Sequence, residues 1–274
     1  WDVSARATYG SNFGEIPFGD IRQFSGDQIP LSEVDRLVPN HDVIAAGFPC
    51  QPFSSAGVSA RNSVGKAHGF ACDTQGTLFH DIMRIVDAKL EAGNPPKVLL
   101  LENVRNLQRH DSGRTFAVIE QSIRDRGFDF EWAILDSQFL VPQRRKRCYM
   151  VAVRSDLGAD VEMPTIEGVA HPLAEALEPY TTAHERFRIS DTLWSGHEAR
   201  SARNAARGTG FTTGVADPRK PSNTLVARYF KDGKECLIED VPGQNPRMLT
   251  PNECRRLQGY PDHFVLPPSK TAAY

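Results

Sequence analysis

The pattern of hydrophobic and polar positions divides the chain into two parts. Over the first 155 residues, short apolar runs alternate with stretches that place apolar side chains at helical spacing. The expected strands cover residues 42–46, 96–101, 130–135 and 148–153, and the expected helices cover residues 77–91 and 114–126. This β-α-β-α order predicts an α/β fold built on a doubly wound, mostly parallel sheet.

The alternation ends after about residue 160. Residues 180–246 are rich in Gly, Pro, Asn, Thr and Arg and have weak periodicity, which predicts a smaller, loop-rich lobe. We expect short strands in this lobe at residues 223–229 and 235–239.

One clear helix start follows the lobe. Thr250-Pro251-Asn252-Glu253 is a capping box with Pro at the first helical position, and Gly259 follows as a stop. The expected domains are a doubly wound domain at 1–170, a lobe at 180–246 and a C-terminal segment at 247–274 that returns to the first domain.

Composition adds bounds to this outline. A chain of 274 residues suits one large domain or a domain with a lobe. No apolar run approaches the roughly 20 residues that span a bilayer, and no signal-peptide pattern opens the chain, so we expect a cytoplasmic protein. Five scattered cysteines without a CxxC pair argue against disulfides and zinc, and we expect no metal.

Charge is uneven along the chain. The net charge of −2 does not indicate a globally basic nucleic-acid binder. Residues 200–234, however, hold eight Lys/Arg and two acids, a balance of 8 − 2 = +6. Such a run is more often a solvated surface than a binding site. The basic residues 144–147 are denser and directly precede an expected strand.

Three chemically notable residues follow expected strands. Asp20 follows the segment 16–19, Cys50 follows Ala46 and Glu102 follows Leu101. Ligands of open parallel sheets bind beyond the carboxyl ends of the strands, so an acid, a thiol and a second acid would share one rim.

Cys50 lies in a turn between Pro49 and Pro52. Proline fixes its own φ and restricts the preceding residue, so the thiol is positioned in advance, as a nucleophile must be. A free cysteine is more often a small buried hydrophobe, and we assign that role to the other four. A turn rich in Pro and Gly is poorly suited to that role, so we predict a nucleophile at Cys50.

Six motifs occur in a fixed order and cover nearly the whole chain. They are Gly-Asp-Ile at 19–21, Gly-Phe-Pro-Cys-Gln-Pro-Phe-Ser at 47–54, Gly-Thr-Leu-Phe at 76–79, Glu-Asn-Val at 102–104, Gln-Arg-Arg-Lys-Arg at 143–147 and the segment 247–262. In this order they resemble the motifs of bacterial-type C5-cytosine-specific DNA methyltransferases of restriction-modification systems. An ordered set of this kind is far more specific than any single motif.

The resemblance implies a reaction: transfer of a methyl group from S-adenosylmethionine to C5 of cytosine in a short specific sequence of duplex DNA. The Cys50 thiolate would add to ring C6 and make C5 nucleophilic. Glu102 in its acid form would donate to ring N3, Arg145 would pair with Glu102 and the base O2, and Arg147 would support the loop. The target base must be flipped out of the duplex, because its reacting carbons lie inside the stack.

The resemblance also implies binding residues. For S-adenosylmethionine, Asp20 would accept from the adenine amine beside Ile21, and Trp1 would lie on the adenine or the ribose. Pro49 and Leu78 would line the methyl-bearing side. The lobe at 180–246 would recognise the target, with CCNGG- or GGNCC-like sites as candidates. The residues implied for DNA contact are Phe48, Gln51, Ser54, Gln143, Thr224 and Arg228.

Two segments of the family are missing from the chain: the first cofactor-binding motif, Phe-x-Gly-x-Gly, and the C-terminal Gly-Asn-Ser-Val segment. Three alternatives remain open: a fragment, a split enzyme completed by a second polypeptide, or disordered ends. The implied partners are duplex DNA and, in function, a cognate restriction endonuclease. The resemblance also implies a monomer, or one half of a split enzyme, that is associated with the bacterial nucleoid.

Two alternative functions also remain. The first is an RNA C5-cytosine methyltransferase of the same fold, although the residues that flank Pro49-Cys50 usually differ in that branch. The second is a non-catalytic DNA-binding or regulatory subunit, which would have no need of Cys50, Glu102 and Arg145.

Overall fold

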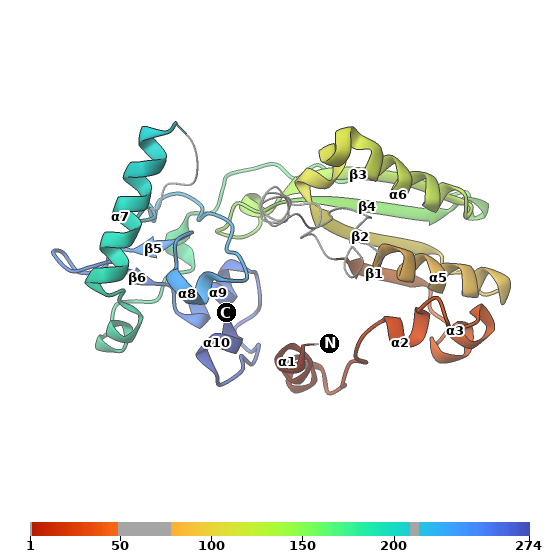
Figure 1. Ribbon diagram of the computed structural model, residues 1–274, viewed down its shortest axis with the longest axis horizontal. Helices are drawn as coiled ribbons and strands as arrows, with labels where there is room; N and C mark the ends of the chain where they lie inside the picture. The colour runs from red at the N-terminus through yellow and green to blue at the C-terminus, as the bar shows by residue number, and fades with distance from the viewer. Residues whose placement is uncertain (1, 49–77, 209–213) are drawn as a thin grey trace. The chain divides into compact units, whose positions relative to one another are not determined.

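The computed structural model describes residues 2–48, 78–208 and 214–274. The chain divides into two compact units, which are described separately here (Figure 1). Unit 1 comprises Trp1–Pro17, Asp136–Arg145 and Ile166–Tyr274, and unit 2 comprises Phe18–Leu135 and Lys146–Thr165.

Unit 2 is built on a four-stranded sheet with the order β1-β2-β4-β3. Its strands are β1 (Val43–Gly47), β2 (Val98–Val104), β3 (Phe128–Asp136) and β4 (Lys146–Arg154). All four expected strands are therefore present. β1 and β2 are parallel, whereas β4 is antiparallel to β2. Only the short segment 137–145 joins β3 to β4, and a parallel crossover needs a dozen or more residues, so the sheet is mixed.

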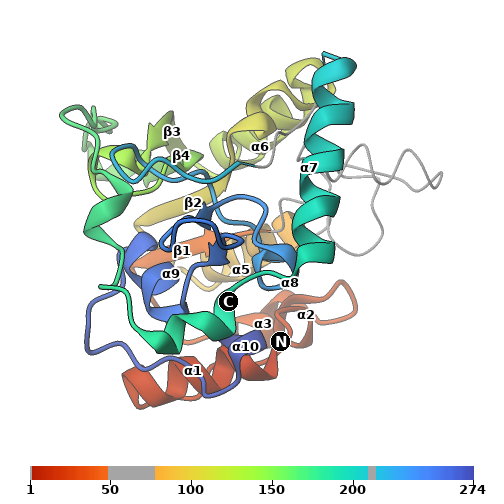
Figure 2. The ribbon, with the colours of Figure 1, turned by 90° about the vertical axis from the view of Figure 1, so that its left-hand side faces the viewer.

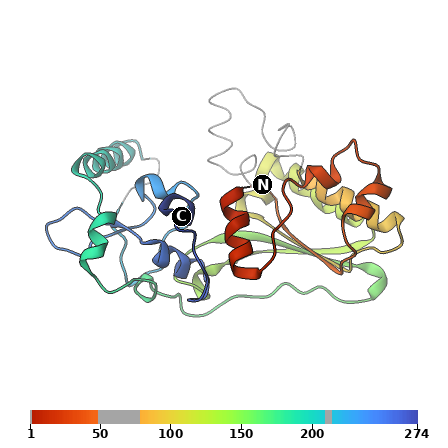
Figure 3. The ribbon, with the colours of Figure 1, turned by 90° about the horizontal axis from the view of Figure 1, so that it is seen from below.

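The core of unit 2 lies on one face of this sheet. The helices α5 (Leu78–Glu91) and α6 (Arg114–Arg124) lie along that face (Figures 1 and 3). Alternate residues of the strands meet them, because successive side chains of a strand point to opposite faces. The buried members include Phe79 and Val86 of α5, Ile119 and Ile123 of α6, Leu99 and Leu101 of β2, and Cys148 and Met150 of β4.

The first helices of unit 2 are short. They are α2 (Arg22–Ser25) and α3 (Leu31–Leu37), and both pack against α5. Lys89 of α5 is buried, and its Nζ donates to the carbonyls of Asp35 and Val38 at the end of α3. These bonds satisfy carbonyls that the helix itself leaves unpaired.

The expected strand at residues 16–19 is wrong. These residues adopt no regular structure, and Ile16 and Phe18 are exposed. Pro17 removes a backbone donor and Gly19 offers no side chain to pack, which weakens pairing with a neighbouring strand. Asp20 consequently precedes α2 instead of ending a strand.

Unit 1 contains mostly helices and irregular segments (Figure 2). Its elements are α1 (Val3–Phe13), α7 (Asp191–Ala206), α8 (Tyr229–Asp232), β5 (Leu237–Ile238), β6 (Arg247–Met248), α9 (Pro251–Leu257) and α10 (Lys270–Ala273). β5 and β6 are antiparallel. A second core joins Leu173, Phe187, Tyr229, Leu249 and Leu257. Residues 166–172, which open the last segment of this unit, form no helix or strand (Figure 3).

The predictions for this part of the chain had mixed outcomes. The capping box is confirmed, because the Thr250 side chain accepts from Glu253 N and the Glu253 side chain accepts from Thr250 N. The expected strand at 235–239 is reduced to β5. The strand expected at 223–229 is wrong, because Asn223 and Thr224 use their side chains to bond the backbones of Glu235 and Arg144, which competes with strand pairing.

Among the residues that the structure describes, no helix combines the length and apolar composition that crossing a membrane requires.

Candidate active site

The carboxyl ends of β1 and β2 bring two predicted motifs together. The parallel register pairs Gly47 of β1 with Glu102 of β2. A Cβ atom on Gly47 would lie 3.3 Å from Glu102 Oε2, which is tighter than an ordinary contact. Glycine at 47 therefore leaves room for the Glu102 carboxylate. The sequence placed Gly47 in the motif without indicating this reason.

Glu102 forms an ion pair with Arg147 of β4. Arg147 Nε lies 3.0 Å from Glu102 Oε1. The antiparallel register pairs Val104 with Arg147 and Glu102 with Tyr149, so the two charged side chains are diagonal neighbours on one face of the sheet. The family resemblance implied Arg145 as the partner of Glu102; the ion pair that the structure shows is with Arg147. Arg147 lies within β4, where the register holds it beside Glu102, whereas Arg145 precedes the strand.

Asn103 points to the opposite face, where it is almost fully buried. Its Nδ2 donates to the Phe48 carbonyl at 3.2 Å. Asn103 thereby fixes the backbone directly before Pro49 and Cys50. The signal was present in the sequence, because Asn103 follows Glu102 in one motif, but the partner lies 55 residues away.

Phe48 itself lies in the core and not on a DNA-facing surface. Its side chain is buried, and its ring centroid lies 5.6 Å from that of Phe79. The DNA contact implied for its side chain therefore has no support in this arrangement. Other predicted site residues, Trp1, Pro49, Cys50, Gln51 and Ser54, lie outside the described residues.

Three of the remaining cysteines are described, and all are buried free thiols. Desolvation raises the pKa of Cys148 to about 12, with a smaller contribution from the Glu102 charge. Desolvation likewise raises the pKa of Cys236 to about 12 and that of Cys254 further. A thiolate is the reactive form of cysteine, so these three are poor nucleophiles at neutral pH.

In unit 1, Gln143 is fully buried and has no access to a ligand. Its Nε2 donates to the Leu257 carbonyl at 3.1 Å, and its Oε1 accepts from Leu225 N at 3.3 Å. The implied DNA contact of its side chain is therefore corrected: Gln143 ties the segment before Arg144 to α9 and to the lobe.

Thr224 is also engaged in unit 1. Its hydroxyl donates to the Arg144 carbonyl at 2.6 Å, and Arg144 N donates to the Ser222 carbonyl at 3.0 Å. The adjacent Arg145 is half-buried, and its backbone N–H donates to Asp136 Oδ1. The lobe and the motif at 143–147 are thus joined through backbone groups, a link that sequence spacing could not reveal.

Of the residues implied for DNA contact, Arg228 alone among those described is an exposed charged side chain. It occupies the N-cap position of α8.

The residues expected at the cofactor lie in unit 2. Hydrogen bonds from the Arg22 side chain and backbone lower the pKa of Asp20 to about 2, so Asp20 is an ionised acceptor. Ile21 packs against the core, and Leu78 is the half-buried first residue of α5. Asp20 and Arg22 line a cavity of about 790 Å³ with polar residues of α5, including His80 and Asp81.

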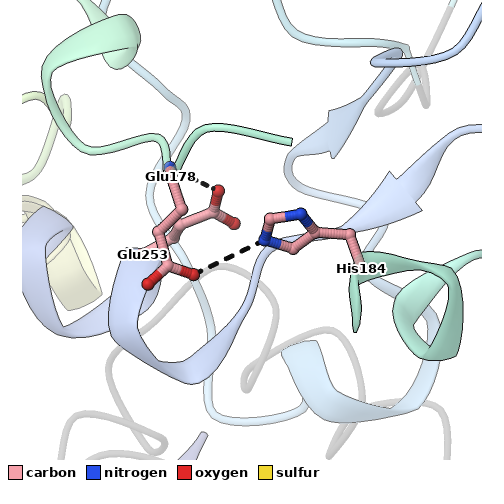
Figure 4. A group of neighbouring side chains, drawn as sticks. All are labelled: Glu178, His184 and Glu253. Atoms are coloured by element: carbon pink, nitrogen blue, oxygen red, sulfur yellow. Dashed lines mark hydrogen bonds and ion pairs between the residues drawn. The ribbon is translucent and has the colours of Figure 1, made fainter. Parts of the chain in front are cut away.

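A cluster in unit 1 has the residue types of a metal site, but its possible ligand atoms are already engaged in hydrogen bonds within the protein. Possible ligand atoms of Glu178, His184 and Glu253 lie within 4.8 Å of one another (Figure 4). His184 Nδ1 accepts from Thr181 N, so its Nε2 carries the proton and faces Glu178 Oε2 at 3.6 Å.

The two carboxylates of this cluster are also engaged. Each oxygen of Glu253 accepts two hydrogen bonds, from the Arg247 guanidinium and from the backbones of Thr250 and Glu178. Desolvation raises the pKa of Glu178, but hydrogen bonds from Thr250, Asn252 and His184 outweigh it and lower the pKa. The cluster is thus an internally satisfied network that holds α9.

Comparison with known proteins agrees with this geometry. The family model for C-5 cytosine-specific DNA methylase matches residues 1–274. The DNA-cytosine methyltransferase of Escherichia coli (strain K12) is 39% identical over 324 residues, which cover 100% of this chain and 67% of that protein. The Type II methyltransferase M.NlaX of Neisseria lactamica is 42% identical over 276 residues, which cover 100% of this chain and 80% of that protein.

Solved structures show the same fold. The Dnmt2 methyltransferase of S. pombe aligns with a TM-score of 0.68 and 15% identity, covering 99% of this chain and 81% of that chain. The Spodoptera frugiperda DNMT2 mutant aligns with a TM-score of 0.69 and 19% identity, covering 100% of this chain and 84% of that chain. At these identities the likeness carries the fold alone, and it confirms the expected α/β fold class.

Proposed function

Because the chain belongs to the C-5 cytosine-specific DNA methylase family, we propose that Cys50 is the nucleophile with which it methylates cytosine in DNA. The protein is a DNA-cytosine methyltransferase, and the names of its relatives give DNA as their substrate. The residue assignment is supported by two contacts beside the end of β1. Glu102 lies next to Gly47 and pairs with Arg147, and Asn103 donates to the Phe48 carbonyl two residues before Cys50.

The reaction begins at the cytosine ring. The Cys50 thiolate adds to C6, and the electron pair of the C5–C6 bond becomes available at C5. S-adenosylmethionine, the general methyl donor of this family, supplies when bound a sulfonium methyl group for C5. The C5 proton then leaves, the C6–S bond breaks, and the thiolate and the aromatic ring are restored.

Glu102 carries the electrostatic part of this mechanism. In its acid form it donates a proton to ring N3 while the thiolate adds, which withdraws electrons from the ring. Arg147 orients the carboxyl through its Nε, and Gly47 provides the space for it. Asn103 is a positioning residue, since it fixes the Phe48 carbonyl two residues before Cys50. Arg145 belongs to the same motif as Arg147, and we assign it to the base or to a neighbouring phosphate.

The cofactor assignment rests on Asp20 and its surroundings. An adenine amine needs an acceptor, and Asp20 is ionised. Arg22 donates to both of its oxygens, yet each carboxylate oxygen has more than one acceptor position. These residues therefore fit the adenine end of S-adenosylmethionine. Ile21 would flank the ring, and Leu78, Trp1 and Pro49 would line the rest of the site.

Target recognition falls to the lobe at 180–246. Arg228 is exposed there and offers a cation to DNA, whereas Thr224 would reach a base or phosphate only through the hydroxyl lone pairs left by its bond to Arg144. Because the relatives are named Type II methyltransferases, we also propose a cognate restriction endonuclease as the functional partner, with CCNGG- or GGNCC-like sites as the first targets to test.

Covalent trapping tests the nucleophile. Short duplexes that carry 5-fluorocytosine in candidate sites are incubated with the full-length protein and S-adenosylmethionine, because fluorine at C5 blocks the final elimination. We expect an adduct that survives denaturing electrophoresis and maps to Cys50. Cys50→Ala abolishes it, whereas the matched control Cys148→Ala retains it. Trapping that persists in Cys50→Ala, or methyl transfer to ordinary cytosine without any trapped adduct, would refute the assignment.

A further inference from the structure

Charge is segregated around α7, the longest helix of unit 1 within the described residues. At about 3.6 residues per turn, Arg200, Arg203 and Arg207 fall on one side of the helix. The acids Asp191 and Glu198 fall on the opposite side. We call the three arginines the arginine flank; all three are exposed.

The inward side of α7 fixes the orientation of this flank. His197 is fully buried, and its Nε2 donates to the Asp232 carbonyl of α8 at 2.9 Å. Leu193 and Trp194 pack against the second core. These contacts lie next to the arginine flank around the helix, and they leave the three arginine side chains exposed. Figures 1 and 2 show the C-terminal turns of α7 extending beyond the other elements drawn for its unit.

The arginines have few partners within the described part of the chain. Arg200 Nη1 lies 3.9 Å from Asp232 Oδ2, a long contact at a side chain that is 45% exposed. Arg203 and Arg207 pair with no acidic group among the described residues. Within this unit the flank thus presents positive charge that is not neutralised.

Helix stability alone does not account for the pattern. Cations near a helix C-terminus are favourable, but that effect is confined to the last turn and applies to any side of the helix. Like charges three or four residues apart destabilise a helix, and Arg200, Arg203 and Arg207 have those spacings. A partner that neutralises all three at once explains their placement better.

We propose that the arginine flank of α7 binds the phosphate backbone of duplex DNA beside the target site. Arg200 and Arg207 are separated by about 10 Å along the helix axis. Over that length duplex DNA carries about six phosphate charges. The flank displays charge without a built pocket, which suits phosphate contacts that position the protein, and not the reading of base edges. This inference rests on the proposed function, in which the lobe at 180–246 faces DNA.

Salt dependence of DNA binding tests the proposal. The affinity of the full-length protein for a duplex is measured by fluorescence anisotropy across a series of salt concentrations. Each phosphate contact contributes about 0.9 to the magnitude of the slope of log K against log [salt]. We expect Arg203→Gln with Arg207→Gln to reduce that magnitude by about 1.8, with the same loss for specific and unrelated sequences.

Matched controls isolate the flank. The first control, Arg36→Gln, removes one positive charge, as each flank substitution does, but at an exposed arginine that pairs with Glu33. The second control, Glu198→Gln, changes a charge on the opposite side of α7. Both should leave the slope unchanged. Circular dichroism checks that α7 stays folded. A slope equal to that of the Arg36 control, a loss confined to one base position, or weakened binding to RNA alone would overturn the proposal.

The trapping assay separates this inference from the proposed function. At low salt the Arg203→Gln/Arg207→Gln protein should still trap 5-fluorocytosine through Cys50, because the flank contributes affinity and not chemistry. If the unaltered protein traps no cytosine but the flank variants still reduce the salt slope, the nucleophile assignment fails and the arginine flank stands.

Discussion

Two glutamate–arginine pairs, one in each unit, differ in how completely they are satisfied. In unit 1, Glu253 and Arg247 are almost fully buried, and two bonds of 2.7 and 2.9 Å join them. In unit 2, the Glu102 side chain is 35% exposed and that of Arg147 is 16% exposed, and Arg147 Nε lies 3.0 Å from Glu102 Oε1. The two pairs have the same chemistry but different surroundings.

The difference in hydrogen bonding distinguishes a carboxylate with a structural role, Glu253, from one that is available for function, Glu102. Every acceptor position of Glu253 is occupied by Arg247 or by backbone N–H groups, so it can do nothing but hold α9 and β6 together. Among the described residues, Glu102 Oε2 accepts no hydrogen bond and faces the space that Gly47 leaves open. An incompletely satisfied acid beside a fixed backbone turn is available to a ligand.

The largest expected effect is on catalysis, at the exposed pair. Glu102→Gln removes the acid that assists the ring and should lower the rate of methyl transfer by a factor of about 10²–10⁴. The melting temperature should change little, because a partly exposed ion pair contributes about 0–1 kcal/mol to stability. Single-turnover methyl transfer and thermal melting measure the two quantities. Full activity of Glu102→Gln, or a large fall in its melting temperature, would contradict the assignment of a catalytic and not a structural role to Glu102.

The next effect is on stability, at the buried pair. Glu253→Gln removes one of the two carboxylates that pair with the buried Arg247 guanidinium and leaves it Asp240 alone. The free energy of unfolding should fall by about 3 kcal/mol, the lower end of the range for breaking a buried ion pair. Urea denaturation measures it, and exposed Glu239→Gln is the control. If Glu253→Gln were as harmless as Glu239→Gln, burial would not distinguish the two pairs.

The smallest effect concerns a third carboxyl, buried without an arginine. Glu235 is 4% exposed, and its Oε2 has no hydrogen-bond partner among the described residues. Desolvation raises its pKa, although a backbone hydrogen bond and the charge of Lys234 oppose the shift. The folded protein thus disfavours the charged form, so stability falls as the pH rises from the unfolded-state pKa through the raised folded-state pKa. Glu235→Gln should remove that fall and stabilise the protein at neutral pH.

Denaturation midpoints between pH 4 and 8 compare Glu235→Gln with the unaltered protein, a range that spans the ordinary pKa of glutamate, about 4.3. If the stability difference between Glu235→Gln and the unaltered protein does not grow with pH, ionised Glu235 does not destabilise the folded protein, and the prediction is wrong.

Local patterns gave much of the fold and the site. The four strands of unit 2, the capping box at Thr250 and the position of Glu102 at a strand end follow from contiguous residues, and the structure has them. The failures are local as well: the strand expected at 16–19 contains Pro17, and the one at 223–229 competes with side-chain bonds of Asn223 and Thr224.

The interaction partners of the site residues could not be predicted from local sequence patterns. The family resemblance paired Glu102 with Arg145 and placed Gln143 on DNA. In the structure, Glu102 forms an ion pair with Arg147. Gln143 is hydrogen-bonded to the backbones of Leu257 and Leu225. Each of these partners is remote in sequence, and only strand register and the packing of distant segments bring it into contact.

The sequence by itself therefore determined the family, the chemistry and the order of the motifs, because those depend on residue identity and on neighbours along the chain. Tertiary structure decided which arginine orients Glu102, why residue 47 is glycine and which charges of α7 face outward. Such choices depend on strand register, on burial and on the removal of polar groups from water, and these exist only once distant segments have packed together.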